Sequence, residues 1–202
     1  LNAVAQDEAL REAYNACLPL ISEYSTEVGQ NSDLFAAYQA LRDSDEFKTL
    51  TPAQQKDIDN TLRDFRLSGV ALPDAQKRQY MENAKRLSEL TTRFENNLLD
   101  ATQAWQKHVT DESELAGLPD TALAGTADRA RAEGLDQGWL LTLDFPVFFA
   151  VISHAENRAL REEMYRAFTT RASDQGPQAG EYDNSAVMDE ILKLRHEQAN
   201  PV

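Results

Sequence analysis

The chain of 202 residues contains a single cysteine, Cys17, so it cannot form an internal disulfide. This excludes a disulfide-stapled scaffold and favours a reducing compartment, so we expect a cytoplasmic protein. No apolar run approaches the roughly 18–20 residues needed to span a bilayer. Eight glycines and seven prolines are few for this length, which indicates long regular elements.

Positive charge is also scarce. The chain has 20 Lys and Arg against 34 Asp and Glu, a formal net charge of −14. The basic residues are interleaved with acidic ones and form no stripe. We therefore expect neither a nucleic acid nor a membrane surface as a partner. With 42% hydrophobic and 27% charged residues, the composition is typical of a globular protein.

Helical periodicity and capping signals occur in the first third of the chain. Apolar side chains at spacings of three and four predict a helix over residues 7–28; these are Leu10, Tyr14, Cys17, Leu18, Ile21 and Tyr24. Because Cys17 belongs to this stripe, we interpret it as a small core residue and not as a nucleophile. A second helix is predicted to begin at Ser32. A sharper start is Thr51-Pro52-Ala53-Gln54, in which Thr51 caps, Pro52 suits the first turn and Gln54 completes a capping box.

The longest predicted helix covers residues 73–104. Its apolar line repeats on average every 3.5 residues, the period of helices packed side by side at a shallow angle. We expect Leu87, Phe94 and Leu98 to be buried along this line. An intramolecular helical hairpin is favoured over an intermolecular coiled coil, because neighbouring helices exist in the same chain.

Strand-like alternation occurs in two short stretches, residues 105–110 and 139–144. Helices are predicted over 119–133, 145–152 and 156–171, and a last helix begins at Asn184-Ser185. The predicted fold is mainly α: an elongated helical array with one long helix, helical hairpins and one short antiparallel β pair.

Motifs for metal chemistry are incomplete. The sequence His196-Glu197-Gln198-Ala199-Asn200 places asparagine where a zinc peptidase helix needs its second histidine. The other histidines, His108 and His154, are far away in sequence and have no ligand nearby. We therefore predict no catalytic residue and no metal site in this chain.

One segment is longer than a helix connection requires. Residues 172–184 form a loop of thirteen residues, rich in small and polar types, with Gly176, Pro177, Gly180 and one aromatic, Tyr182. A surface connection without function and a binding loop both fit this composition.

Several tracts resemble the thimet-oligopeptidase family of zinc metallopeptidases. They are Leu160–Phe168, Thr170–Pro177, Tyr182–Ser185 and Ile191–Glu197, with further agreement at Leu18–Thr26, Leu67–Pro73, Arg86–Leu90 and Leu140–Asp144. The resemblance covers essentially the whole chain and implies the N-terminal portion of a neurolysin-like zincin fold. It implies a helical wall region over residues 1–135 and the start of the catalytic region over 136–202. The family continues into an apolar Leu-Gly segment where this sequence reads Asn200-Pro201-Val202.

The resemblance also implies a function. The family's zinc-binding His-Glu-x-x-His helix would lie beyond Val202, so we expect zinc in the complete enzyme and none in this chain. The chain would form one wall of a channel in a metalloendopeptidase that degrades short peptides. Its partners would be those peptides and the catalytic remainder of the same polypeptide.

The loop is expected to face this channel, with Arg171 and Tyr182 as the substrate-channel candidates, and to be poorly ordered in the isolated chain. The alternative is a stand-alone helical binding or scaffold module derived from such a peptidase.

Overall fold

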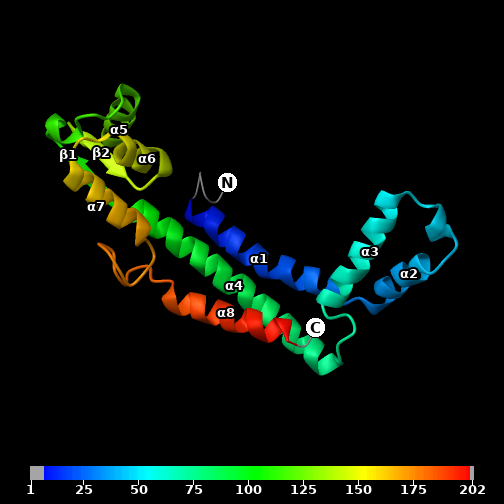
Figure 1. The fold of residues 1–202 in the computed structure, drawn as a ribbon. Helices are drawn as coiled ribbons and strands as arrows, with labels where there is room; N and C mark the ends of the chain where they lie inside the picture. The colour runs from blue at the N-terminus through cyan, green and yellow to red at the C-terminus, as the bar shows by residue number, and fades with distance from the viewer. Residues whose placement is uncertain (1–6, 201–202) are drawn as a thin grey trace. The chain divides into compact units, whose positions relative to one another are not determined.

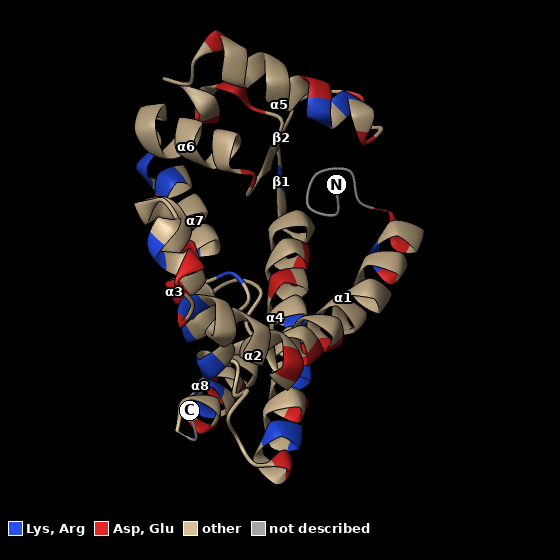
Figure 2. Cartoon of the chain, turned by 90° about the vertical axis from the view of Figure 1, so that its right-hand side faces the viewer, with Lys and Arg blue, Asp and Glu red and all other residues tan. Residues whose placement is uncertain are grey.

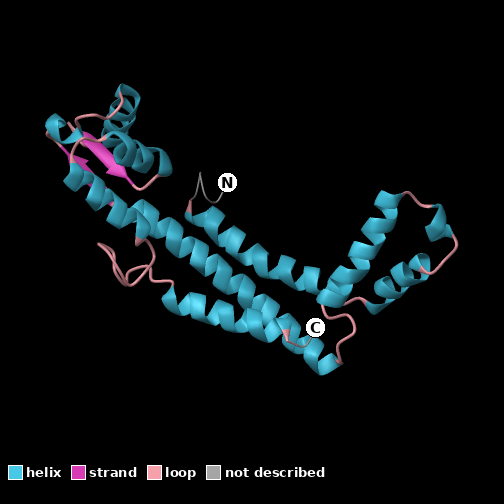
Figure 3. Cartoon of the chain, viewed as in Figure 1, coloured by secondary structure: helices cyan, strands magenta, loops and turns pink. Residues whose placement is uncertain are grey.

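A computed structural model describes residues 7–200 and confirms a mainly helical chain with one β pair (Figures 1 and 3). The elements follow in the order α1 (Glu8–Gly29), α2 (Ser32–Arg42), η1 (Glu46–Thr49), α3 (Pro52–Leu67), α4 (Asp74–Ala104), β1 (Gln106–Val109), η2 (Glu112–Leu115), α5 (Asp120–Ala132), β2 (Trp139–Thr142), α6 (Phe145–His154), α7 (Arg158–Thr169) and α8 (Ser185–Ala199). The 3₁₀ turns η1 and η2 were not predicted.

The chain forms two compact units. The first comprises Leu1–Thr92 and Asp189–Val202, and the second Arg93–Met188, so that α4 and α8 each contribute to both. The division predicted at residue 135 concerns the regions of a longer peptidase and stays a prediction.

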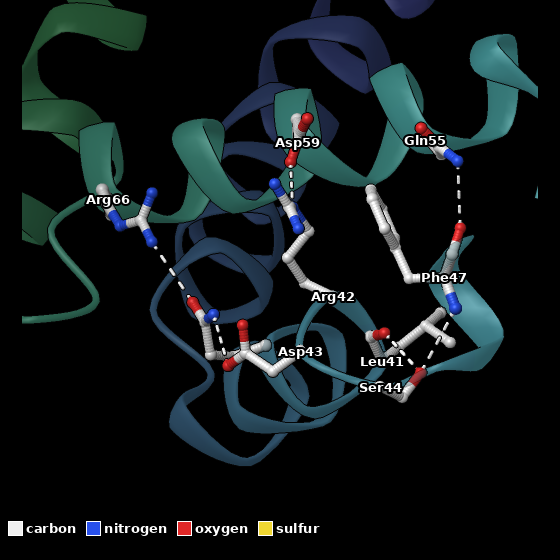
Figure 4. A network of polar contacts seen from close by, with 9 residues as sticks. Leu41, Arg42, Asp43, Ser44, Phe47, Gln55, Asp59 and Arg66 are labelled. Carbon is white, nitrogen blue, oxygen red and sulfur yellow. Dashed lines mark hydrogen bonds and ion pairs between the residues drawn. The ribbon is translucent and has the colours of Figure 1, made fainter.

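In the first unit, α2, η1 and α3 form a hairpin around a small core of Phe47, Ile58 and Leu62. The capping box that begins α3 is present as predicted: the side chain of Thr51 accepts from the Gln54 amide, and Gln54 reaches back to the Thr51 amide. Polar contacts close the hairpin on its outside (Figure 4). They are the Arg42–Asp59 ion pair at 2.6 Å, the hydrogen bond from Gln55 to the Phe47 carbonyl, and that from Arg66 to Gln39.

The same unit holds α1 beside α4, and α4 beside α8 (Figure 1). The Ser22 hydroxyl of α1 donates to the Ala84 carbonyl of α4 at 3.5 Å. Arg86 of α4 pairs with Glu190 of α8 at 2.6 Å and with Glu89 on its own helix.

The predicted line on α4 is only partly buried. Leu87, Phe94 and Leu98 are half-buried, so the expectation that they are buried holds only in part. The most buried leucine of α4 is Leu90, at 1% exposure, and it shares its helix face with Asn83, at 5%. An apolar pattern could not identify this face, because a buried asparagine interrupts it.

Cys17 also differs from expectation. Its side chain is exposed, so its interpretation as a core residue is wrong. The reason is that the apolar stripe of α1 does not face the interior of its unit, although α1 itself is present with nearly the predicted bounds.

The second unit packs α5, α6 and α7 with the β pair around the larger core. The strands β1 and β2 are antiparallel, with Gln106 opposite Thr142 and Val109 opposite Trp139, which confirms the predicted pair. The core residues come from both strands, from η2, α6 and α7, and from the segments that connect them; they are Trp105, Val109, Leu115, Leu118, Leu141, Leu143, Val151, Ala155, Leu160, Met164 and Ala167.

Two features of the surface bear on partners. Lys and Arg are scattered among Asp and Glu along the helices, without a continuous basic stripe on the side drawn in Figure 2. Within residues 7–200, no helix combines the length and the apolar character needed to cross a membrane.

Candidate functional site

The loop between α7 and α8 is anchored at its start by Arg171. The Arg171 Nε donates to the Phe168 carbonyl at 2.9 Å, and Nη1 donates to the Thr102 hydroxyl of α4 at 2.9 Å. The guanidinium carbon lies 3.7 Å from the centroid of the Phe168 ring, a cation–π contact. Phe168 in turn stacks on Phe148 at 3.8 Å between centroids. Arg171 is therefore held in a fixed direction by two hydrogen bonds and one aromatic face.

The charge of Arg171 is not balanced by an acid within the part of the chain that the structure describes. Both of its hydrogen bonds go to neutral oxygens. Burial lowers the pKa of the Arg171 guanidinium, yet arginine stays protonated at neutral pH. A fixed cation with neutral partners can still attract a carboxylate.

The other end of the loop is anchored by Asn184, which is 2% exposed. Its Nδ2 donates to the Phe94 carbonyl of α4 at 3.1 Å, and its Oδ1 accepts from Asn97 Nδ2 at 2.9 Å. Its backbone N–H donates to the Ala172 carbonyl at 3.0 Å, so the first and last residues of the loop are hydrogen-bonded to each other. Such a closed loop with neighbouring ends has the form of an Ω-loop.

Inside the loop, backbone contacts replace regular structure. The Gly180 N–H donates to the Ser173 carbonyl at 3.1 Å. Gly176 has φ +81, and a Cβ there would lie 1.9 Å from the Thr170 hydroxyl, so only glycine fits. The loop is thus hydrogen-bonded within itself, and its poor order in the isolated chain stays a prediction.

The loop borders a hollow of about 280 Å³ in the second unit. Gly176 and Pro177 of the loop line it together with Trp105, Glu163 and Arg166. Glu163 pairs with Lys107 at 2.8 Å. The hollow therefore combines an aromatic wall with charges of both signs, a lining that suits a polar, extended ligand such as a peptide.

Of the two predicted site residues, Arg171 lies at the base of the loop and Tyr182 lies two residues before Asn184, half-buried. The sequence identifies Asn184 only as the start of the last helix and does not reveal it as an anchor. Its polar partners, Asn97 and the Phe94 carbonyl, lie about ninety residues earlier in the chain. No local pattern reveals such a contact.

The histidines do not assemble a metal centre. His196 Nε2 lies 3.3 Å from Asn200 Nδ2, and His108 Nε2 lies 2.7 Å from the Gln137 carbonyl. Among residues 7–200, no three His, Cys, Asp or Glu side chains are grouped so as to hold a metal ion. The residues described do not fit a zinc site.

Comparison with known proteins shows what this chain is similar to. Residues 1–77 match the model of the neurolysin/thimet oligopeptidase N-terminal domain, and residues 151–202 match that of peptidase family M3. The chain is 57% identical over 199 residues to oligopeptidase A of Escherichia coli and 54% identical to that of Haemophilus influenzae. It is 38% identical over 205 residues to a probable cytosolic oligopeptidase A of Arabidopsis thaliana.

Each of these matches covers 98% of this chain but only 28–29% of the relative. The chain thus spans less than a third of the length of the relatives that it resembles.

Proposed function

We propose, from the premise that the chain belongs to peptidase family M3, that it is the N-terminal helical part of an oligopeptidase A-like zinc metalloendopeptidase acting on short peptides. The observation that carries this proposal is the 57% identity to an oligopeptidase A over 98% of the chain. The chain supplies channel wall and loop, and the zinc and its ligands belong to the remainder of the polypeptide. The complete enzyme works in the cytoplasm, with short peptides as substrates.

The closed loop is the part of this chain that contacts the peptide. Tyr182 can contact the peptide through its aromatic ring and its hydroxyl. Arg171 can attract a carboxylate of the peptide, because both of its hydrogen bonds go to neutral oxygens. The three contacts of Arg171 also give it a positioning role, because they connect the loop to α4 and α7. Rigid support of this kind is what a substrate-binding loop requires.

The overall proposal is tested on the product of the complete reading frame. A quenched fluorogenic peptide should be hydrolysed, with loss of activity on chelation and recovery on addition of zinc. The 202-residue chain alone should be inactive and hold no stoichiometric zinc. A stop codon directly after the codon for Val202 would favour the alternative, a stand-alone helical binding or scaffold module.

The role of Tyr182 is tested in the complete enzyme. Replacement by alanine should lower kcat/KM for a short peptide about tenfold, equivalent to about 1.4 kcal/mol of transition-state binding. Tyr165→Ala is the matched control, since Tyr165 is an exposed tyrosine on α7, at 59%. An unchanged kcat/KM in a folded Tyr182→Ala enzyme would contradict a contact with the peptide.

A further inference from the structure

Helix α1 carries its apolar side chains outward. Six residues form a stripe about 120° wide at 100° per residue, which we name the outer stripe; they are Tyr14, Cys17, Leu20, Ile21, Tyr24 and Val28. Three of them are more than half exposed: Leu20 at 65%, Ile21 at 59% and Tyr24 at 68%. In a water-facing helix this side would normally be polar.

The opposite side of α1, which faces the interior, carries mostly small and polar residues beside the half-buried Leu18. Thr26 is 8% exposed and donates to the Ser22 carbonyl, while the Ser22 hydroxyl contacts the Ala84 carbonyl of α4. A Cβ on Gly29 would lie 2.8 Å from the Ser68 side chain, so the backbones approach closely there. The amphipathic pattern of α1 is therefore inverted relative to its packing in this unit.

A stripe of this size in contact with water is unfavourable, and contiguous apolar patches on soluble proteins mark interfaces. We propose that the outer stripe of α1 is a docking surface for the part of the longer polypeptide that lies outside these 202 residues. The inference rests on the proposed function, because it requires that longer polypeptide. The relatives contain additional chain that can supply such a surface. They are more than three times as long as this chain, and nearly the whole of this chain aligns with part of each of them.

Charge specifies the partner surface further and disfavours a second copy. Glu12, Glu23 and Glu27 follow one edge of the outer stripe at neighbouring angles around the helix. A complementary surface therefore carries apolar side chains with Lys or Arg along one border. Two copies of this chain would bring together surfaces of net charge −14 each and the same acidic edges.

Cys17 provides a probe of this interface, because it lies within the outer stripe, is exposed, and is the only cysteine of these 202 residues. The complete protein is treated with iodoacetamide under native and denaturing conditions, and alkylation of the Cys17 peptide is followed by mass spectrometry. We expect native alkylation to be at least about tenfold slower than in the denatured protein, because the docked surface excludes the reagent.

Substitutions test whether the stripe itself makes the contact. Ile21→Lys in the complete protein should raise the native alkylation rate of Cys17 about fivefold or more, because a buried lysine opposes docking. Glu8→Lys is the matched control, since Glu8 is exposed on the side of the same helix opposite the outer stripe, and should leave the rate within about twofold. Ile21→Ala is a milder second variant, expected to raise the rate in the same direction if the lysine variant does not fold.

Each result has a defined meaning. Protection of Cys17 in a monomer at all concentrations supports the proposal. Native alkylation as fast as in the denatured protein overturns it, and protection that is lost on dilution of a dimer overturns it in favour of a second copy. Peptide hydrolysis is measured separately, so an inactive protein with protected Cys17 contradicts the proposed function and not the docking surface.

Discussion

Replacing Asn184 by alanine should destabilise the chain more than its position at a loop end suggests. The substitution removes the hydrogen bond to the Phe94 carbonyl and leaves Asn97 without its acceptor. An ordinary hydrogen bond contributes about 0.5–1.5 kcal/mol, and a buried group left unpaired costs about 1–3 kcal/mol. Because Asn97 is half-buried and can regain water, the lower end applies to it, and we expect a total loss of about 1.5–3 kcal/mol.

The free energy of unfolding is measured by urea titration of the 202-residue chain, followed by far-ultraviolet circular dichroism. Asn157→Ala is the matched control. Asn157 is also an asparagine before a helix, but its side chain only caps α7 through the Leu160 amide, so its loss should cost about 1 kcal/mol.

A double-mutant cycle isolates the contact between the two asparagines. Asn97→Ala and Asn184→Ala together should cost less than the sum of the single changes, by about 0.5–1.5 kcal/mol. A loss below about 0.5 kcal/mol for Asn184→Ala, or strict additivity with Asn97→Ala, would refute the reasoning that this pair closes the loop.

Two further predictions follow from burial and charge. Leu90→Ala should cost about 2–5 kcal/mol in urea unfolding because Leu90 is 1% exposed, whereas Leu87→Ala should cost less than half as much; equal losses would contradict the packing described for α4. The Ser185 hydroxyl and, to a lesser extent, the Ser185 amide donate hydrogen bonds to Asp183 and lower the pKa of this carboxyl below 3.8. The ionised carboxylate therefore stabilises the fold above pH 3.8, and this contribution is lost as the pH falls through the lowered pKa. An NMR titration midpoint for Asp183 at or above 3.8, or one that Ser185→Ala does not raise, would contradict this assignment.

Local chemistry predicted most of the secondary structure. The start of α3 follows from Thr51, Pro52 and Gln54 alone, since capping depends on neighbours within one helical turn. The β pair follows from alternation in two short stretches, because residues on one face of a strand recur every second position. These elements depend on interactions that a short window of sequence contains.

The anchors of the candidate site depend on interactions that no short window contains. Asn97 is half-buried on α4, where an apolar pattern treats it as solvent-facing. Asn184 has its partners on an element far away in the sequence. A polar residue becomes a suitable interior residue only when a partner satisfies it, and the sequence does not state which residue that partner is.

Helix α1 shows that an apolar pattern predicts a helix but not the surface that covers it. The periodicity of Tyr14, Ile21 and Tyr24 correctly identifies a helix with one apolar side, because that side must leave water somewhere. It does not identify the surface that covers this side, since burial is favourable against any apolar neighbour. Within these 202 residues, α1 contacts the interior of its unit through Ser22, Thr26 and Gly29, whose small size allows neighbouring segments to approach the helix closely. The mismatch between pattern and packing is therefore the ground for the proposed docking surface, and the reactivity of Cys17 in the complete protein tests it.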